Sequence, residues 1–165
     1  MDIVMTKWAA MKWTADVICD KKEDLSREFP LWFLDEGAGL GDLLSVERDR
    51  RTAASFGVTD ILELSEHGVF GGLWELGESL GCGLTCILAH IPIRQETVEI
   101  ANLYDVNPYQ LPSEGSLLMA VPDGRKLCEA FEAEGINACV IGRLSDTNDR
   151  VVKGSETVRF LDKIR

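Results

Sequence analysis

The chain has 165 residues, of which 45% are apolar, enough to build the core of one domain and too few for us to expect two. Its 28 Asp and Glu residues against 17 Lys and Arg give a formal charge of −11, which disfavours a nucleic-acid partner because the phosphate backbone is also negative. No run approaches the roughly 20 apolar residues of a membrane span, and the N-terminus lacks a signal-peptide pattern, so no membrane partner is expected.

The first third of the chain is predicted to hold one strand followed by three helices. The opening DIVMTKW alternates and is rich enough in β-branched residues for a strand. Three segments with helical apolar spacing follow, and Pro30 and Gly57 are typical start and stop residues for them. Trp8 and Trp13 fit a core or an exposed docking face equally well. The predicted elements span residues 2–8, 12–25, 31–40 and 46–56.

The central stretch, residues 58–81, is predicted to be a strand, a tight turn and a helix. Its turn is Ser65-Glu66-His67-Gly68, and the helical pattern ends at Gly81. Ser65 can cap the helix, while Gly68 lets another backbone or a ligand approach the first turn. Amide groups without helical partners favour an anion there. We therefore expect a ligand or phosphate site at this turn, with a purely structural turn as the alternative.

The second half of the chain continues to alternate strands with helices. Strands are predicted over residues 82–88, 116–121 and 138–144, with a closing pair through residues 151–152 and 158–160, and helices over residues 94–104 and 123–134. Interleaved elements of this kind indicate a layered sheet domain with helices.

A second candidate site is the tripeptide Ser113-Glu114-Gly115, which lies between a turn and a predicted strand. A carboxylate at this position could orient a substrate or act as a base if burial raised its pKa. Most such tripeptides are solvated turns in which glycine supplies an unusual φ, so this alternative also stays open.

The cysteines form an odd set in apolar segments, without the paired spacing of a secreted disulfide framework. This pattern favours a reducing compartment, and we expect a soluble cytoplasmic protein. Cys82 and Cys86 share one face of a predicted strand, where a metal site would have to recruit His67 and His90. We favour core positions and expect no metal, because buried free cysteine is common as a small apolar residue.

Two segments resemble the C-terminal domain shared by aminoimidazole ribonucleotide (AIR) synthase, selenophosphate synthetase and the hydrogenase-maturation carbamoyl dehydratase. They are SEHGVFGGLWELGESLGCGL (residues 65–84) and NPYQLPSEGSLLMAV (residues 107–121), the second being nearest to the hydrogenase-maturation branch. The resemblance implies a PurM-type C-terminal fold over residues 1–165 as a single domain: α+β, with α/β/α layers around a mixed sheet of partial ferredoxin-like character. In the family an ATP-binding domain precedes this one, and nothing here matches it.

The family motif is approximately His-Asp-x-Thr-x-Gly-Gly, and it is only partly kept. Leu62 replaces the His, Glu63 and Ser65 retain an acid and a hydroxyl, and His67-Gly68 stand at the two glycines. The loss of the imidazole and the Trp13 that replaces a glycine favour decay of the site. The resemblance gives Glu63 and Glu114 as catalytic candidates, and as ligand-binding candidates Ser65, Glu66, His67, Gly68, Ser113 and Gly115.

The resemblance implies ATP and Mg²⁺ for full-length members of the family, which are ATP-dependent synthases, dehydratases and kinases. We expect this chain alone to hold no cofactor and not to be catalytic, because neither a Lys/Arg clamp nor acidic metal ligands can be assigned. Its expected partner is the N-terminal ATP-binding domain or a partner protein, with a homodimer as a weaker expectation. The dehydratase tail chemistry is not carried over, since no cysteine follows Cys139. The alternative is a diverged stand-alone binding or regulatory module.

Overall fold

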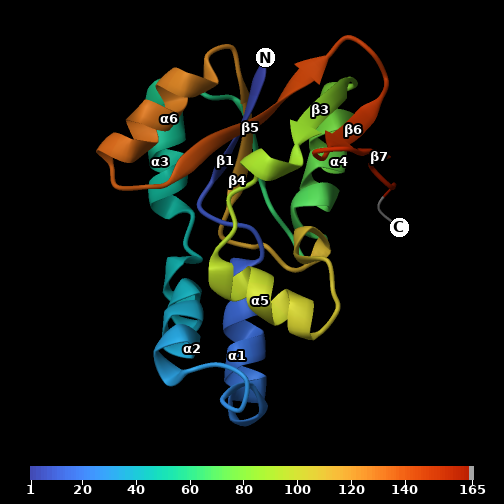
Figure 1. Cartoon of the computed structure of the whole chain (residues 1–165). Helices are drawn as coiled ribbons and strands as arrows, with labels where there is room; N and C mark the ends of the chain where they lie inside the picture. The colour runs from blue at the N-terminus through green and yellow to red at the C-terminus, as the bar shows by residue number, and fades with distance from the viewer. Residues whose placement is uncertain (164–165) are drawn as a thin grey trace.

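A mixed seven-stranded sheet organises the molecule in the computed structural model, which describes residues 1–163 (Figure 1). The strand order is β2-β4-β1-β5-β3-β6-β7, in which β3 and β6 run parallel and the other neighbouring pairs are antiparallel. The strands are β1 (Asp2–Thr6), β2 (Asp60–Glu63), β3 (Gly83–Ile87), β4 (Leu117–Val121), β5 (Ala138–Ser145), β6 (Arg150–Lys153) and β7 (Val158–Phe160).

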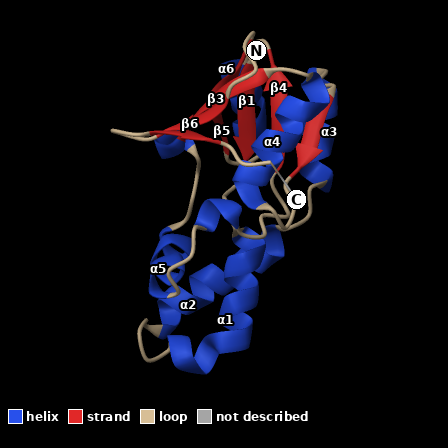
Figure 2. Cartoon of the chain, turned by 90° about the vertical axis from the view of Figure 1, so that its right-hand side faces the viewer, coloured by secondary structure: helices blue, strands red, loops and turns tan. Residues whose placement is uncertain are grey.

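Six α-helices surround the sheet in three groups. α4 packs on one face, and α3 and α6 pack on the other, whereas α1, α2 and α5 form a separate cluster beyond one end of the strands (Figures 1 and 2). The helices are α1 (Met11–Leu25), α2 (Leu31–Ala38), α3 (Glu47–Phe56), α4 (Gly68–Leu80), α5 (Gln95–Leu103) and α6 (Gly124–Ala133), with short 3₁₀ turns η1 (Gly39–Leu43), η2 (Leu88–His90) and η3 (Pro108–Gln110).

β1 is an interior strand of the sheet, between β4 and β5, and separates two apolar layers. Ile3 and Met5 are buried in the layer under α4, while Val4 is buried in the layer under α3 and α6. Such two-sided burial is typical of a central strand. The α+β fold with a mixed sheet flanked by helices is therefore confirmed.

The helix predicted over residues 31–40 is shorter than expected. α2 ends at Ala38, and the chain continues as the 3₁₀ turn η1. Gly37, Gly39 and Gly41 lower the helix propensity of this stretch, which explains the early end. Within residues 1–163, no helix is both long enough and apolar enough to cross a bilayer.

Candidate functional site

The two segments singled out in the sequence meet at one end of the sheet. Glu63 on β2 is paired with Leu117 on β4, and the chain on either side of this pair continues into the turn and the loop. The amide of Ser113 donates to the carbonyl of Ser65 at 3.0 Å, and the amide of Gly115 donates to Oε2 of Glu63 at 3.4 Å. The structure therefore brings together groups that lie 52 residues apart in the chain.

Ser65 is not the N-cap of α4, and that prediction was wrong. The N-cap residue is His67, whose side chain makes no capping bond. Gly68 has a φ of 73°, so the chain passes through a left-handed residue before the helix is established. The Ser65 hydroxyl instead accepts the amide of His67 at 3.2 Å, and the Ser65 carbonyl accepts the amide of Gly68 at 3.1 Å. Ser65 thus stabilises the turn that leads into the helix.

Gly68 is covered by another stretch of backbone. A Cβ at this position would lie 2.5 Å from the Tyr109 carbonyl oxygen and 2.8 Å from the Leu111 carbonyl oxygen. The ring of Tyr109 also stacks on Phe70, with centroids 5.5 Å apart. The sequence left open whether another backbone or a ligand approaches Gly68, and the structure shows a backbone there. A ligand would therefore have to approach the turn from another side.

A cavity of about 220 Å³ opens at the start of α4, next to the segment that covers Gly68. His67, Arg159 and Lys163 give it three basic side chains, and Asp162, which lies 3.9 Å from Arg159, is its one carboxylate. The remaining lining residues are Phe70, Gly71, Gln110 and Leu161. Basic groups at a helix start suit an anion. Arg159 and Lys163 could not be predicted from the sequence, since neither lies in a motif.

Ser113 and Gly115 act within the chain. Ser113 is fully buried, and its hydroxyl accepts the amide of Ala10 and donates to the carbonyl of Leu111, both at 2.8 Å. Gly115 has a φ of 102°, and both of its backbone polar groups are bonded inside the chain. These bonds stabilise the loop, and ligand binding by Ser113 and Gly115 stays a prediction.

The two catalytic candidates differ in how fully they are paired. The Glu63 carboxylate accepts the Gly115 amide and lies 3.7 Å from the Arg50 guanidinium. Glu114 is half-buried, and its Oε1 is shielded from solvent without a hydrogen-bond partner among residues 1–163. A shielded acceptor of this kind lowers the stability of the fold unless a donor forms a hydrogen bond with it. Glu114 is therefore the carboxylate with spare capacity to accept a hydrogen bond.

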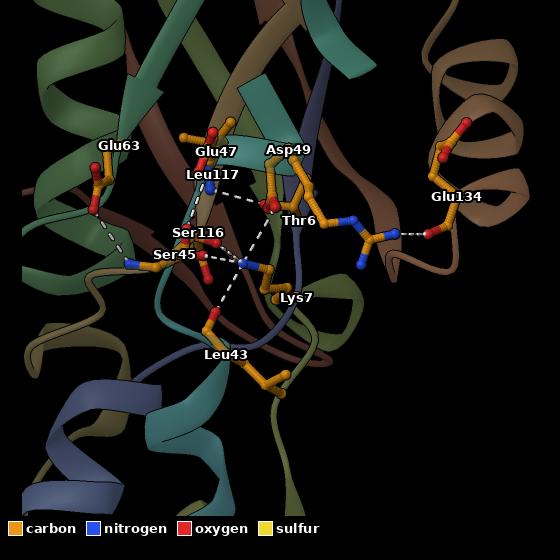
Figure 3. Close-up of polar contacts among 12 residues, drawn as sticks. Thr6, Lys7, Leu43, Ser45, Glu47, Asp49, Glu63, Ser116, Leu117 and Glu134 are labelled. Carbon is orange, nitrogen blue, oxygen red and sulfur yellow. Dashed lines mark hydrogen bonds and ion pairs between the residues drawn. The ribbon is translucent and has the colours of Figure 1, made fainter. Parts of the chain in front are cut away.

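A buried lysine fixes the loop at Gly115 and was missed in the sequence (Figure 3). Lys7 Nζ donates to the carbonyls of Leu43 and Ser45 at 2.8 Å and of Gly115 at 3.0 Å, and lies 3.3 Å from Oδ1 of Asp49 on α3. The side chains of Lys7 and Asp49 are only 10% and 2% exposed. Three carbonyls and one carboxylate therefore converge on one ammonium group, which ties β1 to α3 and to the loop.

The cysteines are not grouped for a metal. Cys86 is fully buried in the apolar layer under α4, and burial raises the pKa of its thiol to about 12. Burial likewise raises the pKa of the Cys128 thiol to about 11. Across the described part of the chain no three side chains of the His, Cys, Asp and Glu types gather in a way that could hold a metal ion. Cys86 has the predicted core position, whereas Cys82 is only half-buried and lies just before β3, so the two do not share a strand face.

Alkylation by iodoacetamide at pH 8 is expected to discriminate sharply between Cys19 and Cys86. Cys19 is exposed on α1, whereas Cys86 is inaccessible and almost entirely protonated well below its pKa of about 12. Peptide mass spectrometry should show Cys19 labelled first and Cys86 labelled only after denaturation. Labelling of Cys86 at a similar rate in the native protein would contradict its placement in the core.

In its fold and in part of its sequence, this chain is similar to HypE and ThiL, which are members of the PurM-related superfamily. No family model matches the chain. Among curated proteins it is 33% identical over 95 residues to the carbamoyl dehydratase HypE of Rhodobacter capsulatus, a match that covers 55% of this chain and 28% of that protein.

Solved structures of similar fold match nearly the whole of this chain. HypE of E. coli has a TM-score of 0.75 at 17% identity, over 98% of this chain and 49% of that chain. A HypE solved in complex with ATP has a TM-score of 0.68 at 14% identity, over 99% of this chain and 50% of that chain. AaThiL complexed with AMPPCP and TMP has a TM-score of 0.64 at 15% identity, over 98% of this chain and 49% of that chain. The chain thus spans about half the length of these solved structures.

Proposed function

We propose that this chain is the C-terminal domain of a HypE-like, ATP-dependent protein and forms one wall of a cleft for a nucleotide or a phosphorylated substrate. The observation that carries the proposal is the basic cavity at the start of α4, where His67, Arg159 and Lys163 line about 220 Å³ next to the helix N-terminus. The nucleotide or nucleotide analogue in two structures of similar fold supports a phosphate as the anion.

The roles proposed for this chain and for an N-terminal domain follow from the groups that this chain can offer to a ligand. His67 and the other basic side chains of the cavity can contact an anion, whereas Glu66 is exposed, lies 3.6 Å from His67 and does not line the cavity. Glu114 can accept a hydrogen bond from a substrate. Phosphoryl transfer also needs Mg²⁺ held by acidic ligands, and the described residues offer no such cluster. An N-terminal ATP-binding domain would supply the metal and most nucleotide contacts, so this chain should not turn over ATP by itself.

A second candidate function is a stand-alone binding or regulatory module. Leu62 in place of the family histidine favours it, as do the internal bonds of Ser113 and the backbone that covers Gly68. Such a module would keep the fold without catalysis. The two functions differ in one respect that can be measured: only the first requires the chain to complete an active site with another domain.

Calorimetric titration with inorganic phosphate and with Mg-ATP is expected to show binding at the α4 cavity. Arg159→Gln should weaken both affinities about tenfold, because one charge-assisted hydrogen bond is lost. Arg143→Gln is the matched control, since Arg143 is a 78% exposed strand arginine paired with Asp2 at 3.5 Å, outside this cavity. Absence of binding, or equal losses in both variants, would contradict an anion site here.

Mixing this chain with the separately expressed N-terminal half of a HypE-like protein tests the catalytic part of the proposal. We expect the two chains to associate and ATP turnover to rise above that of either half. Association without turnover, in a mixture whose N-terminal half still binds Mg-ATP, would favour the regulatory module. Glu114→Gln should lower turnover in the complex without weakening association.

A further inference from the structure

A second cavity lies between α3 and α6, on the sheet face opposite α4. Its volume of about 430 Å³ is within the usual range for small-molecule sites. The part on α3 consists of Arg48, Arg51, Thr52, Ser55 and Phe56, and the part on α6 and just after it consists of Ala130, Ala133 and Glu134.

The α3 side presents hydrogen-bond donors along one helical stripe. Arg48, Arg51, Thr52 and Ser55 are spaced i, i+3, i+4 and i+7, so two guanidinium groups and two hydroxyls face the same groove. Guanidinium groups bind carboxylates and phosphates through paired N–H donors. In a chain with a formal charge of −11, this groove gathers two guanidinium groups. The carboxylates near them are Glu134, in the lining, and Glu47, which lies 3.7 Å from Arg51.

Arg48 and Arg51 contact different groups in this structure. Arg48 Nη2 donates to the backbone carbonyl of Glu134, at the C-terminal end of α6, so part of this guanidinium is fixed. Arg51 is 70% exposed and lies 3.7 Å from Glu47, which is 82% exposed. Exposed pairs of this kind contribute little. Arg51 can therefore exchange Glu47 for a ligand at low cost.

The rest of the groove is apolar. Ala130 and Ala133 form its α6 wall, and Phe56, which is 40% exposed, closes one end. An apolar surface beside two guanidinium groups matches a molecule that has an anionic group on an apolar body. We propose that the α3–α6 groove binds an organic anion of this class, a phosphate monoester or a carboxylate whose aromatic or aliphatic part contacts Phe56, Ala130 and Ala133.

Titration of the ¹⁵N-labelled chain with phenyl phosphate, benzoate, benzyl alcohol and inorganic phosphate tests the inference by NMR. Phenyl phosphate or benzoate should shift the amides of α3 and α6 and bind at least about tenfold more tightly than benzyl alcohol, which lacks the charge. Whichever of the two binds more tightly identifies the anionic group. Inorganic phosphate should bind this groove more weakly, because it lacks the apolar body.

Two variants locate the site, and a third is the control. Arg51→Gln should weaken binding of the better probe about tenfold, and Phe56→Ala should weaken it about fivefold, since both side chains are exposed and their loss leaves the core intact. Arg125→Gln, on the 88% exposed arginine of α6 that pairs with Glu129 at 3.5 Å, should leave binding unchanged. The inference fails if Arg125→Gln weakens binding as much as Arg51→Gln, if shifts fall only around His67, or if no probe binds.

Discussion

Replacing Gly68 by alanine is expected to lower the free energy of unfolding by about 2–5 kcal/mol. The left-handed φ of 73° costs a non-glycine residue roughly 1–2 kcal/mol, and the new Cβ would lie 2.5 Å from the Tyr109 carbonyl oxygen, which adds an overpacking cost of about 1–3 kcal/mol. The clash is with backbone, so no side-chain rotation relieves it. Urea denaturation followed by circular dichroism measures the loss.

Gly81→Ala provides the comparison at the other end of the same helix. Gly81 also has a left-handed φ, of 63°, but no atom lies within 4 Å of a Cβ built there. Its replacement should therefore cost only the conformational part, about 1–2 kcal/mol. If the two substitutions destabilised the protein equally, the segment 109–111 would not pack on Gly68 as described.

Replacing Lys7 by methionine is expected to cost about 3–5 kcal/mol of stability, the usual effect of removing one partner of a buried ion pair. The change leaves Asp49 buried without its counter-charge and leaves the carbonyls of Leu43, Ser45 and Gly115 without their shared donor. The Asp49 Oδ2 atom already lacks a hydrogen-bond partner among the described residues, so little nearby can compensate. Denaturant midpoints at neutral pH measure the effect.

A double-mutant cycle separates the charge from the carbonyl contacts. Asp49→Asn in the Lys7→Met background should recover part of the lost stability, because the uncompensated charge is then removed. Lys12→Met is the control, since Lys12 pairs with Asp16 on the surface, and its loss should lower the stability far less. A Lys7→Met cost as small as that of Lys12→Met would show that the buried ammonium does not hold the loop.

The local elements could be predicted because each has a signature in adjacent residues. Helix ends show this well: Gly57 and Gly81 have a left-handed φ directly after α3 and α4, and Gly135 has one just beyond Glu134, the C-cap of α6. Likewise, Asp123 caps α6 by accepting the amide of Lys126 at 3.2 Å. The predicted C-terminal end of α2 was less accurate, because Gly37, Gly39 and Gly41 give no single stop signal for the helix.

The site was less predictable because its contacts lie in the main chain and between distant segments. Lys7 binds carbonyl groups, which every residue has, so nothing in the sequence marks Leu43, Ser45 or Gly115 as its partners. The resemblance led to the correct pair of segments, but it could not show that the Ser113 hydroxyl is already bonded to Ala10 and Leu111. Arg159, which lines the cavity together with His67, lies on β7 and is distant in the sequence from both motifs.

The interior place of β1 in the sheet has a consequence during synthesis of the chain. Its neighbours in the sheet are residues 117–121 and 138–145, so Ile3, Val4 and Met5 have no strand to pair with until most of the chain has left the ribosome. At about 5–20 residues per second this delay is on the order of 10 s. For that time Ile3, Val4 and Met5 form an apolar segment without strand partners, and a ribosome-associated chaperone is expected to bind there.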